Sequence, residues 1–150
     1  MSKRIPNHLS HFPVIKVESY DVMDGKYHKN TDTKGLSLGF SQWSKDDISA
    51  KIWRFTGKQW SPQSEEMPLH RVIDLAILIC ETYESMKNNT IKDFEQKNFQ
   101  KSFAENVSID IAKINAEDFI KFASIFKTDL RSIEDSGRLE ALSKVLKKLV

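Results

Sequence analysis

The chain contains a single cysteine, Cys80, so it can form no disulfide within itself and no cysteine-based metal cluster. A protein without disulfides suits a reducing compartment. The N-terminal residues 1–14 also lack the apolar stretch of about 7 to 15 residues that a secretory signal contains. The sequence therefore predicts a cytoplasmic protein.

Long apolar runs and a strong net charge are absent as well. The longest apolar run covers residues 75–80, whereas a transmembrane helix needs roughly 20 such residues. Lys and Arg number 23 against 21 Asp and Glu, which leaves a net charge of +2. We expect no membrane partner, and a nucleic acid could be attracted only by a local patch of charge.

The chain does have the composition and length of one globular domain. Its 150 residues are 39% hydrophobic and 29% charged, which is ordinary for a folded protein with a core. No internal repeat interrupts the chain. We therefore expect a single α+β domain over residues 1–150.

Alternation of apolar and polar residues predicts strands over residues 12–20, 36–43 and 48–55. Leu38 and Phe40 share one face of the second strand with Leu36, and we expect that apolar face to cover the core. Phe40 should then lie opposite Ala50, which requires a connecting loop of odd length. A two-residue turn at residues 56–57 would place Trp60 opposite Trp53. Residues 21–35 form a long polar loop of undetermined role.

The apolar spacing after Pro68 predicts a helix over residues 68–87 that is apolar nearly all round. We expect this central helix to be buried by more than one layer, with Cys80 hidden inside it. Two further helices are expected, one from Asn115 and one over residues 135–150, whereas residues 90–108 have no clear pattern. His8, His11 and His28 are expected at the surface.

Together these elements predict an α+β fold, in which an antiparallel sheet of three to four strands packs on the buried central helix. The C-terminal part is predicted to be helical.

A first group of candidate site residues lies at the start of the central helix. Glu66, His70 and Asp74 stand at i, i+4 and i+8, with Arg71 adjoining, so a continuous helix would align them on one face. Pro68 would move Glu66 off that line if the helix begins there. One reading makes these residues the polar stripe of a mostly buried helix. The other makes them a polar ligand site or a catalytic site; neither spacing nor motif indicates a metal.

A second group lies on the sheet face opposite the predicted core. Lys51, Trp53, Arg54 and Trp60 combine aromatic rings with positive charge, and serine and glycine residues surround them. Such a face could bind a small molecule, a peptide or the bases of a single-stranded nucleic acid. It could equally be covered by the C-terminal helices.

No nucleotide-binding, nucleophile or calcium-loop motif is complete, so no cofactor is predicted. The leading hypothesis is a non-enzymatic interaction module or small-ligand-binding module, with a protein partner or a homo-oligomer as alternatives. The competing hypotheses are a small enzyme at the first group and nucleic-acid binding at the second.

Three segments, SLGFSQW, ISAKIWRFTG and SEEMPLHRVIDLAILI, resemble a family of small bacterial proteins known only as a domain of unknown function. The resemblance covers roughly residues 9–83, and SEEMPLHR is its most specific block. It implies a bacterial, cytoplasmic protein and carries no catalytic residue with it.

Overall fold

The structure is a computed structural model that describes residues 4–61, 65–87 and 101–150. The chain divides into two compact units, Met1–Asp74 and Leu75–Val150.

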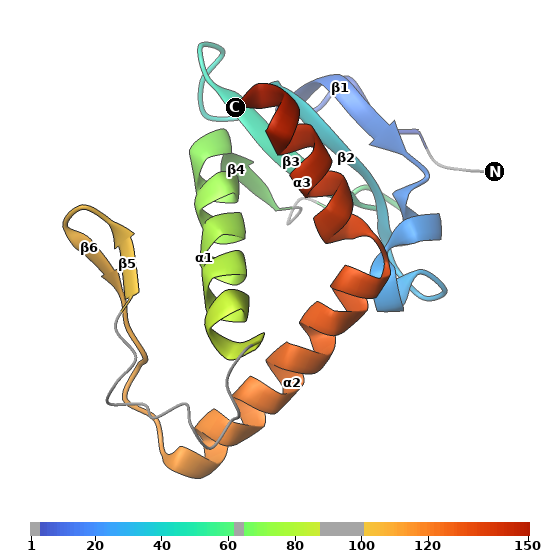
Figure 1. Cartoon of the computed structure of the whole chain (residues 1–150). Helices are drawn as coiled ribbons and strands as arrows, with labels where there is room; N and C mark the ends of the chain where they lie inside the picture. The colour runs from blue at the N-terminus through green and yellow to red at the C-terminus, as the bar shows by residue number, and fades with distance from the viewer. Residues whose placement is uncertain (1–3, 62–64, 88–100) are drawn as a thin grey trace. The chain divides into compact units, whose positions relative to one another are not determined.

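The first unit is built on a four-stranded antiparallel sheet with the order β1-β2-β3-β4 (Figure 1). The strands are β1 (Phe12–Glu18), β2 (Thr33–Phe40), β3 (Ile48–Arg54) and β4 (Glu66–Pro68). Two short 3-10 turns, η1 (Tyr20–Met23) and η2 (Gly25–Tyr27), occupy part of the predicted long loop between β1 and β2. The sheet confirms the predicted α+β architecture, with β4 as a strand that the sequence did not indicate.

The pairing of β2 with β3 has the predicted parity but not the predicted register. Phe40 lies opposite Ile48, and Leu38 lies opposite Ala50, two residues away from the expected pairs. Strand β2 ends three residues earlier than predicted, and the connection closes on itself: the Ser41 hydroxyl donates to the Ser44 carbonyl at 2.8 Å. The connection, residues 41–47, still has odd length, so the apolar residues of both strands share one face.

The turn after β3 also differs from the prediction. The backbone N–H of Thr56 donates to the Gln59 carbonyl at 2.9 Å, so the turn is longer than two residues. Trp60 consequently lies opposite Phe55 and not opposite Trp53. The indole rings of Trp53 and Trp60 are nevertheless in edge contact, with centroids 5.7 Å apart.

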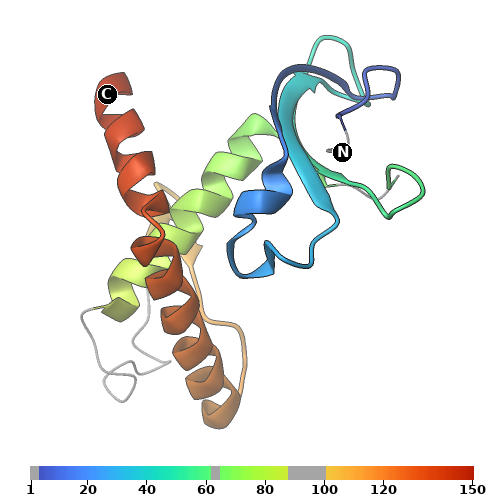
Figure 2. The ribbon, with the colours of Figure 1, turned by 90° about the vertical axis from the view of Figure 1, so that its right-hand side faces the viewer.

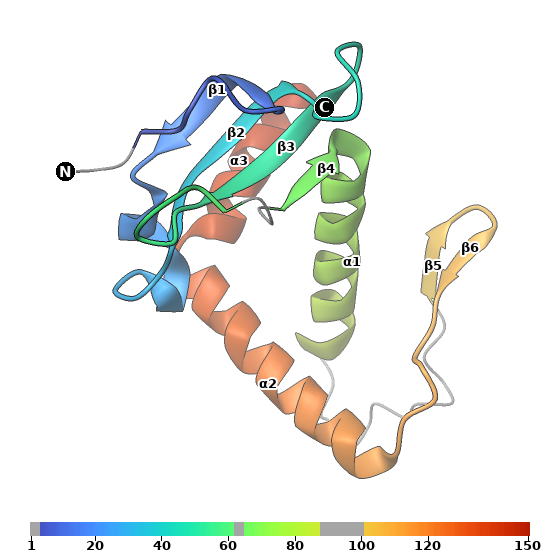
Figure 3. The same ribbon diagram turned by 180° about the vertical axis from the view of Figure 1, so that it is seen from behind.

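The buried face of the sheet is the opposite of the predicted one. Ser37, Ser49 and Trp53 are at most 5% exposed, whereas Leu38 and Phe40 are each 43% exposed. The N-terminal segment, residues 4–11, covers the face of small residues and Trp53; Figures 2 and 3 show this segment in dark blue beside the sheet. Small residues on that face therefore make room for the protein's own chain.

Two glycines of β2 permit the N-terminal segment and the start of β1 to approach this closely. A Cβ added at Gly35 would lie 2.5 Å from the Cδ1 atom of Ile5, which is itself buried. A Cβ added at Gly39 would overlap the backbone carbonyl of Phe12, at the irregular pairing where β1 begins. The backbone N–H of Ile5 donates to the Glu18 carboxylate at 3.0 Å and ties the segment to β1.

Helix α1 (Leu69–Lys87) begins directly after β4 and ends where the sequence predicts. The prediction that it is buried is wrong for most of its length, because only Tyr83 and Met86 are buried, while Ile73 is 59% exposed. Cys80 is likewise exposed and not hidden in a core. The buried core cluster of the second unit consists of Met86, Phe119 and Ala123, so among the described residues Met86 is its one member from α1.

The second unit contains a hairpin and two further helices. The hairpin consists of β5 (Lys101–Ala104) and β6 (Val107–Ile109). The expected helices are α2 (Ala116–Asp135), whose first turn is capped by the Asn115 side chain, and α3 (Arg138–Leu149). The helical C-terminal part is thus confirmed. Of residues 90–108, for which the sequence shows no clear pattern, residues 90–100 lie outside the described residues and the rest belong to this hairpin.

In the part of the chain that the structure describes, no helix is long and apolar enough to cross a bilayer.

Replacing Gly39 with alanine should destabilise the protein, because the new methyl group meets the Phe12 backbone, which cannot rotate away. We expect a loss of roughly 1–3 kcal/mol in the free energy of unfolding, measured by urea denaturation. Leu38→Ala is the matched control, since Leu38 is 43% exposed on the other face and should have the smaller effect. A Gly39→Ala protein as stable as Leu38→Ala would show that the start of β1 does not lie against Gly39 in this way.

Candidate functional site

A buried histidine is the centre of the polar structure beneath the N-terminal segment. His11 is 0% exposed. Its Nε2 atom lies 2.9 Å from the Ser37 hydroxyl. Its Nδ1 atom lies 2.9 Å from the Ser49 hydroxyl and 2.9 Å from the Glu66 carboxylate. The prediction of a surface position for His11 is therefore wrong.

The neighbours of His11 determine where its proton is. Glu66 Oε1 accepts from the Ser49 hydroxyl and the Gln42 N–H, and as a carboxylate oxygen it also accepts from Nδ1, which must therefore carry a proton. The Trp53 indole N–H donates to the Ser37 hydroxyl at 2.8 Å, and this hydroxyl keeps its own proton to donate to Nε2 of the neutral ring. Nε2 is thus an acceptor, and Nδ1 carries the proton that is shared with Glu66 and Ser49. The result is one directed chain of hydrogen bonds that runs from Trp53 through Ser37 and His11 to Glu66.

Glu66 is the last acceptor in this chain of hydrogen bonds, and its two carboxylate oxygens differ in the number of donors that they contact. Oε1 accepts from the Ser49 hydroxyl at 2.7 Å, from His11 Nδ1 at 2.9 Å and from the Gln42 backbone N–H at 3.1 Å. Oε2 is buried and has no hydrogen-bond partner among the described residues. The side chain is only 1% exposed, so Oε2 is shielded from bulk solvent in this conformation.

The charge states follow from burial and from these bonds. Burial lowers the pKa of His11 below its ordinary value of 6.5, and the bond to Glu66 offsets only part of that effect. Burial raises the pKa of Glu66, but the hydrogen bonds from Ser49, Gln42 and His11 outweigh it and hold the pKa below 4.5. The site at neutral pH therefore contains a neutral imidazole and an ionised carboxylate.

The order Ser37, His11, Glu66 has the connectivity of a catalytic serine triad. Ser37 is only 5% exposed, however, and its oxygen already accepts the Trp53 N–H. A substrate carbonyl cannot reach that oxygen, so these three residues form a structural network and not a nucleophilic site.

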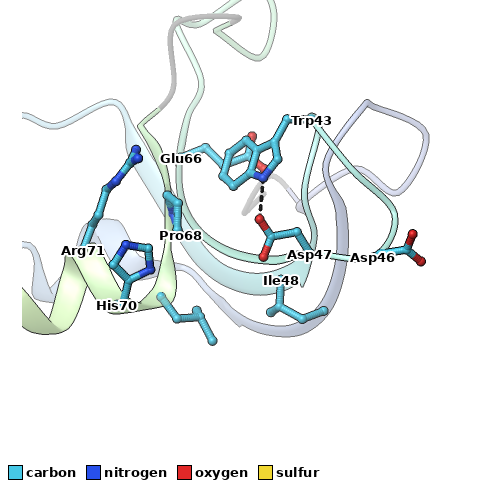
Figure 4. Close-up of a pocket in the computed structure, with 9 residues that line it drawn as sticks. Trp43, Asp46, Asp47, Ile48, Glu66, Pro68, His70 and Arg71 are labelled. Atoms are coloured by element: carbon cyan, nitrogen blue, oxygen red, sulfur yellow. Dashed lines mark hydrogen bonds between the residues drawn. The ribbon is translucent and has the colours of Figure 1, made fainter.

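Glu66 also belongs to the wall of an open pocket of about 830 Å³ in the first unit. The connection between β2 and β3, strand β4 and the first turn of α1 all contribute to this pocket (Figure 4). Its lining residues are Trp43, Asp46, Asp47, Ile48, Glu66, Pro68, Leu69, His70 and Arg71.

The first predicted group is therefore partly brought together. Glu66, His70 and Arg71 line the same pocket, but Glu66 reaches it from β4 and not from the helix. Asp74 is exposed and does not line the pocket. Within the described residues, Asp74 forms no ion pair with His70 or Arg71, so the expected polar stripe has no internal pairing.

The second predicted group does not form an open surface. Trp53 is 1% exposed, and its ring lies 4.2 Å from the Lys51 ammonium group. Arg54 is held by Asp32 at 2.7 Å and by Glu65 at 2.8 Å, and these bonds raise its pKa further. Trp60 packs against Trp53 and Phe55. A nucleobase cannot stack on a buried indole, which weighs against the nucleic-acid hypothesis.

Among the described residues, no three His, Cys, Asp or Glu side chains lie close enough together to hold a metal ion.

The sequence did not indicate His11, Trp43 or Asp47 as residues of the site. The signal for His11 was the row of serines and glycines on the Trp53 face of β2 and β3, since small residues there leave space that a larger group must fill.

The fold and the site define a small α+β protein whose sheet encloses a His–Glu–Ser network beside a polar pocket. The chain belongs to a family of unknown function (DUF6530), whose model matches residues 3–150. The match extends beyond the segment of residues 9–83 on which the resemblance was seen. Comparison with curated proteins and with solved structures gave no match.

The depressed pKa of His11 predicts that acid destabilises the protein before its carboxylates are protonated. Below pH 6.5 the unfolded chain binds a proton at this position that the folded protein excludes. The free energy of unfolding therefore decreases as the pH is lowered. One proton limits the slope to about 1.4 kcal/mol per pH unit. The depressed pKa of Glu66 acts in the same direction, but only below its unfolded value near 4.5.

Urea denaturation of the parent and of His11→Gln between about pH 5.5 and pH 7.5 measures this slope. His11→Gln should have a lower stability throughout and a flatter dependence on pH. His8→Gln, an exposed histidine of the same segment, should keep the parental slope. Equal slopes for the parent and His11→Gln would contradict a buried, neutral His11.

Proposed function

We propose that this protein is a non-enzymatic cytoplasmic module that binds a small polar ligand in the pocket that Glu66, His70 and Arg71 share. The observation that carries the proposal is the buried Oε2 atom of Glu66, which has no hydrogen-bond partner among the described residues. Native proteins leave few buried polar atoms without a partner, and such an atom calls for an explanation. A ligand in the pocket that donates a hydrogen bond would supply it, once the side chains that cover Oε2 in this conformation move aside.

The network behind Glu66 supports the same function. Three donors hold Oε1, and His11, one of those donors, is itself held by Ser37 on its other side. A carboxylate that is fixed in this way loses little conformational freedom when a ligand binds. The buried network therefore serves as the support for a binding group at the pocket wall.

Binding is favoured over catalysis because of what lines the pocket. Among the described lining residues there is no serine, threonine or cysteine nucleophile, which leaves only carboxylates and His70 as reactive groups. Cys80 belongs to the other unit, and Ser37 and Ser49 are buried. The expectation of a protein partner or a homo-oligomer stays a prediction.

A screen of small metabolites by ligand-observed NMR tests the proposal on the purified protein. Compounds that bind the parent should bind Glu66→Gln about 10- to 100-fold more weakly, because a charge-assisted hydrogen bond contributes roughly 1.5–3 kcal/mol. Gln keeps the shape of the side chain and an oxygen for the donors at Oε1.

Glu65→Gln is the control, because it makes the same chemical change at the adjacent residue, which pairs with Arg54 outside the pocket. It should leave binding unchanged. The proposal fails if no compound binds at millimolar concentration, or if every compound binds Glu66→Gln as well as it binds the parent.

A further inference from the structure

The charges of the pocket are separated into two sides. Asp46, Asp47 and Glu66 contribute three carboxylates, and Figure 4 shows the two aspartates on the opposite side of the pocket from His70 and Arg71. A ligand with a single charge would satisfy only one of these sides. The separation points to a ligand with two opposite charges.

The acidic side favours a cationic donor. The ionised Glu66 offers an oxygen with no donor among the described residues, and a cationic donor adds Coulomb attraction to the hydrogen bond. Lys51 lies opposite Glu66 in the pairing of β3 with β4, and its ammonium group lies over the Trp53 ring. Trp43 adds an aromatic ring that is fixed by its N–H bond to Asp47 at 2.6 Å, and such a ring attracts an ammonium group.

The basic side favours a carboxylate. Arg71 forms no ion pair within the described residues, and its guanidinium group can hold a carboxylate through two parallel hydrogen bonds. It lies in the first turn of the 19-residue helix α1, where unpaired backbone N–H groups and the helix dipole also favour an anion.

An apolar surface lies between the two sides. Ile48 and Leu69 both line the pocket and are 39% and 41% exposed, so they offer area that an apolar ligand group could bury.

We infer that the ligand is a zwitterion of the α-amino acid type, with its ammonium group on Glu66, its carboxylate on Arg71 and an apolar side chain against Ile48 and Leu69. This inference rests on the proposed function and specifies the ligand of that same pocket. A free amino acid and a short peptide share this chemistry, and they differ in the distance between the two charges.

Isothermal titration of the parent protein with four compounds tests both charges without any substitution. L-leucine should bind, whereas leucine amide, which lacks the carboxylate, and 4-methylpentanoate, which lacks the amine, should each bind at least about tenfold more weakly. Leucyl-leucine distinguishes the two sources: tighter binding than leucine assigns the site to a short peptide, and weaker binding assigns it to the free amino acid.

Two variants then locate each charge. Arg71→Gln should weaken leucine about tenfold and leave leucine amide within about twofold, since the amide has no carboxylate to lose. Glu66→Gln should weaken leucine and leave 4-methylpentanoate unchanged. Lys45→Gln, an exposed cation of the neighbouring loop that does not line the pocket, should change neither.

Equal binding of leucine and both analogues, or no binding of leucine and leucyl-leucine, would overturn the inference. If other compounds from the metabolite screen still depend on Glu66, a polyamine for example, the pocket remains a binding site and only the zwitterion is wrong. If nothing binds in a Glu66-dependent manner, the proposed function fails together with the inference.

Discussion

The burial of one imidazole ring constrains the rest of the first unit. A fully buried histidine needs a hydrogen-bond partner for each ring nitrogen, and His11 finds them on β2, β3 and β4 in Ser37, Ser49 and Glu66. These bonds require small residues beneath the N-terminal segment and a carboxylate on the last strand. They also fix Glu66 in the wall of the pocket, so the same interaction that closes the fold orients the candidate binding group.

The sequence predicts the strands and their common parity, but not which face is inward. The alternation of apolar and small polar residues places Leu38 and Ser37 on opposite faces of β2. It does not show which of the two faces the rest of the chain covers. The covering group is His11, which lies 26, 38 and 55 residues from its three partners. A local pattern contains no information about a contact at such separations. The helices of the second unit were predictable, because the Asn115 cap and the apolar spacing of α2 are local signals.

The sequence predicted part of the candidate site, but the predicted helical alignment is not what brings its residues together. Helical spacing grouped Glu66 with His70 and Arg71, and all three do line one pocket, although Glu66 belongs to β4. The same spacing included Asp74, which does not line it. Trp43 and Asp47 were missed, because they reach the pocket through the connection between β2 and β3, whose path depends on bonds within the loop.

The protonation state of His11 tests this account most directly. A long-range ¹H–¹⁵N correlation spectrum of the histidine rings at neutral pH, assigned by comparison with His11→Gln, reports which nitrogen carries the proton. We expect a neutral ring with the proton on Nδ1 at neutral pH, and a pKa below the ordinary value of 6.5. A proton on Nε2, or a ring that titrates near 6.5 like an exposed histidine, would contradict it.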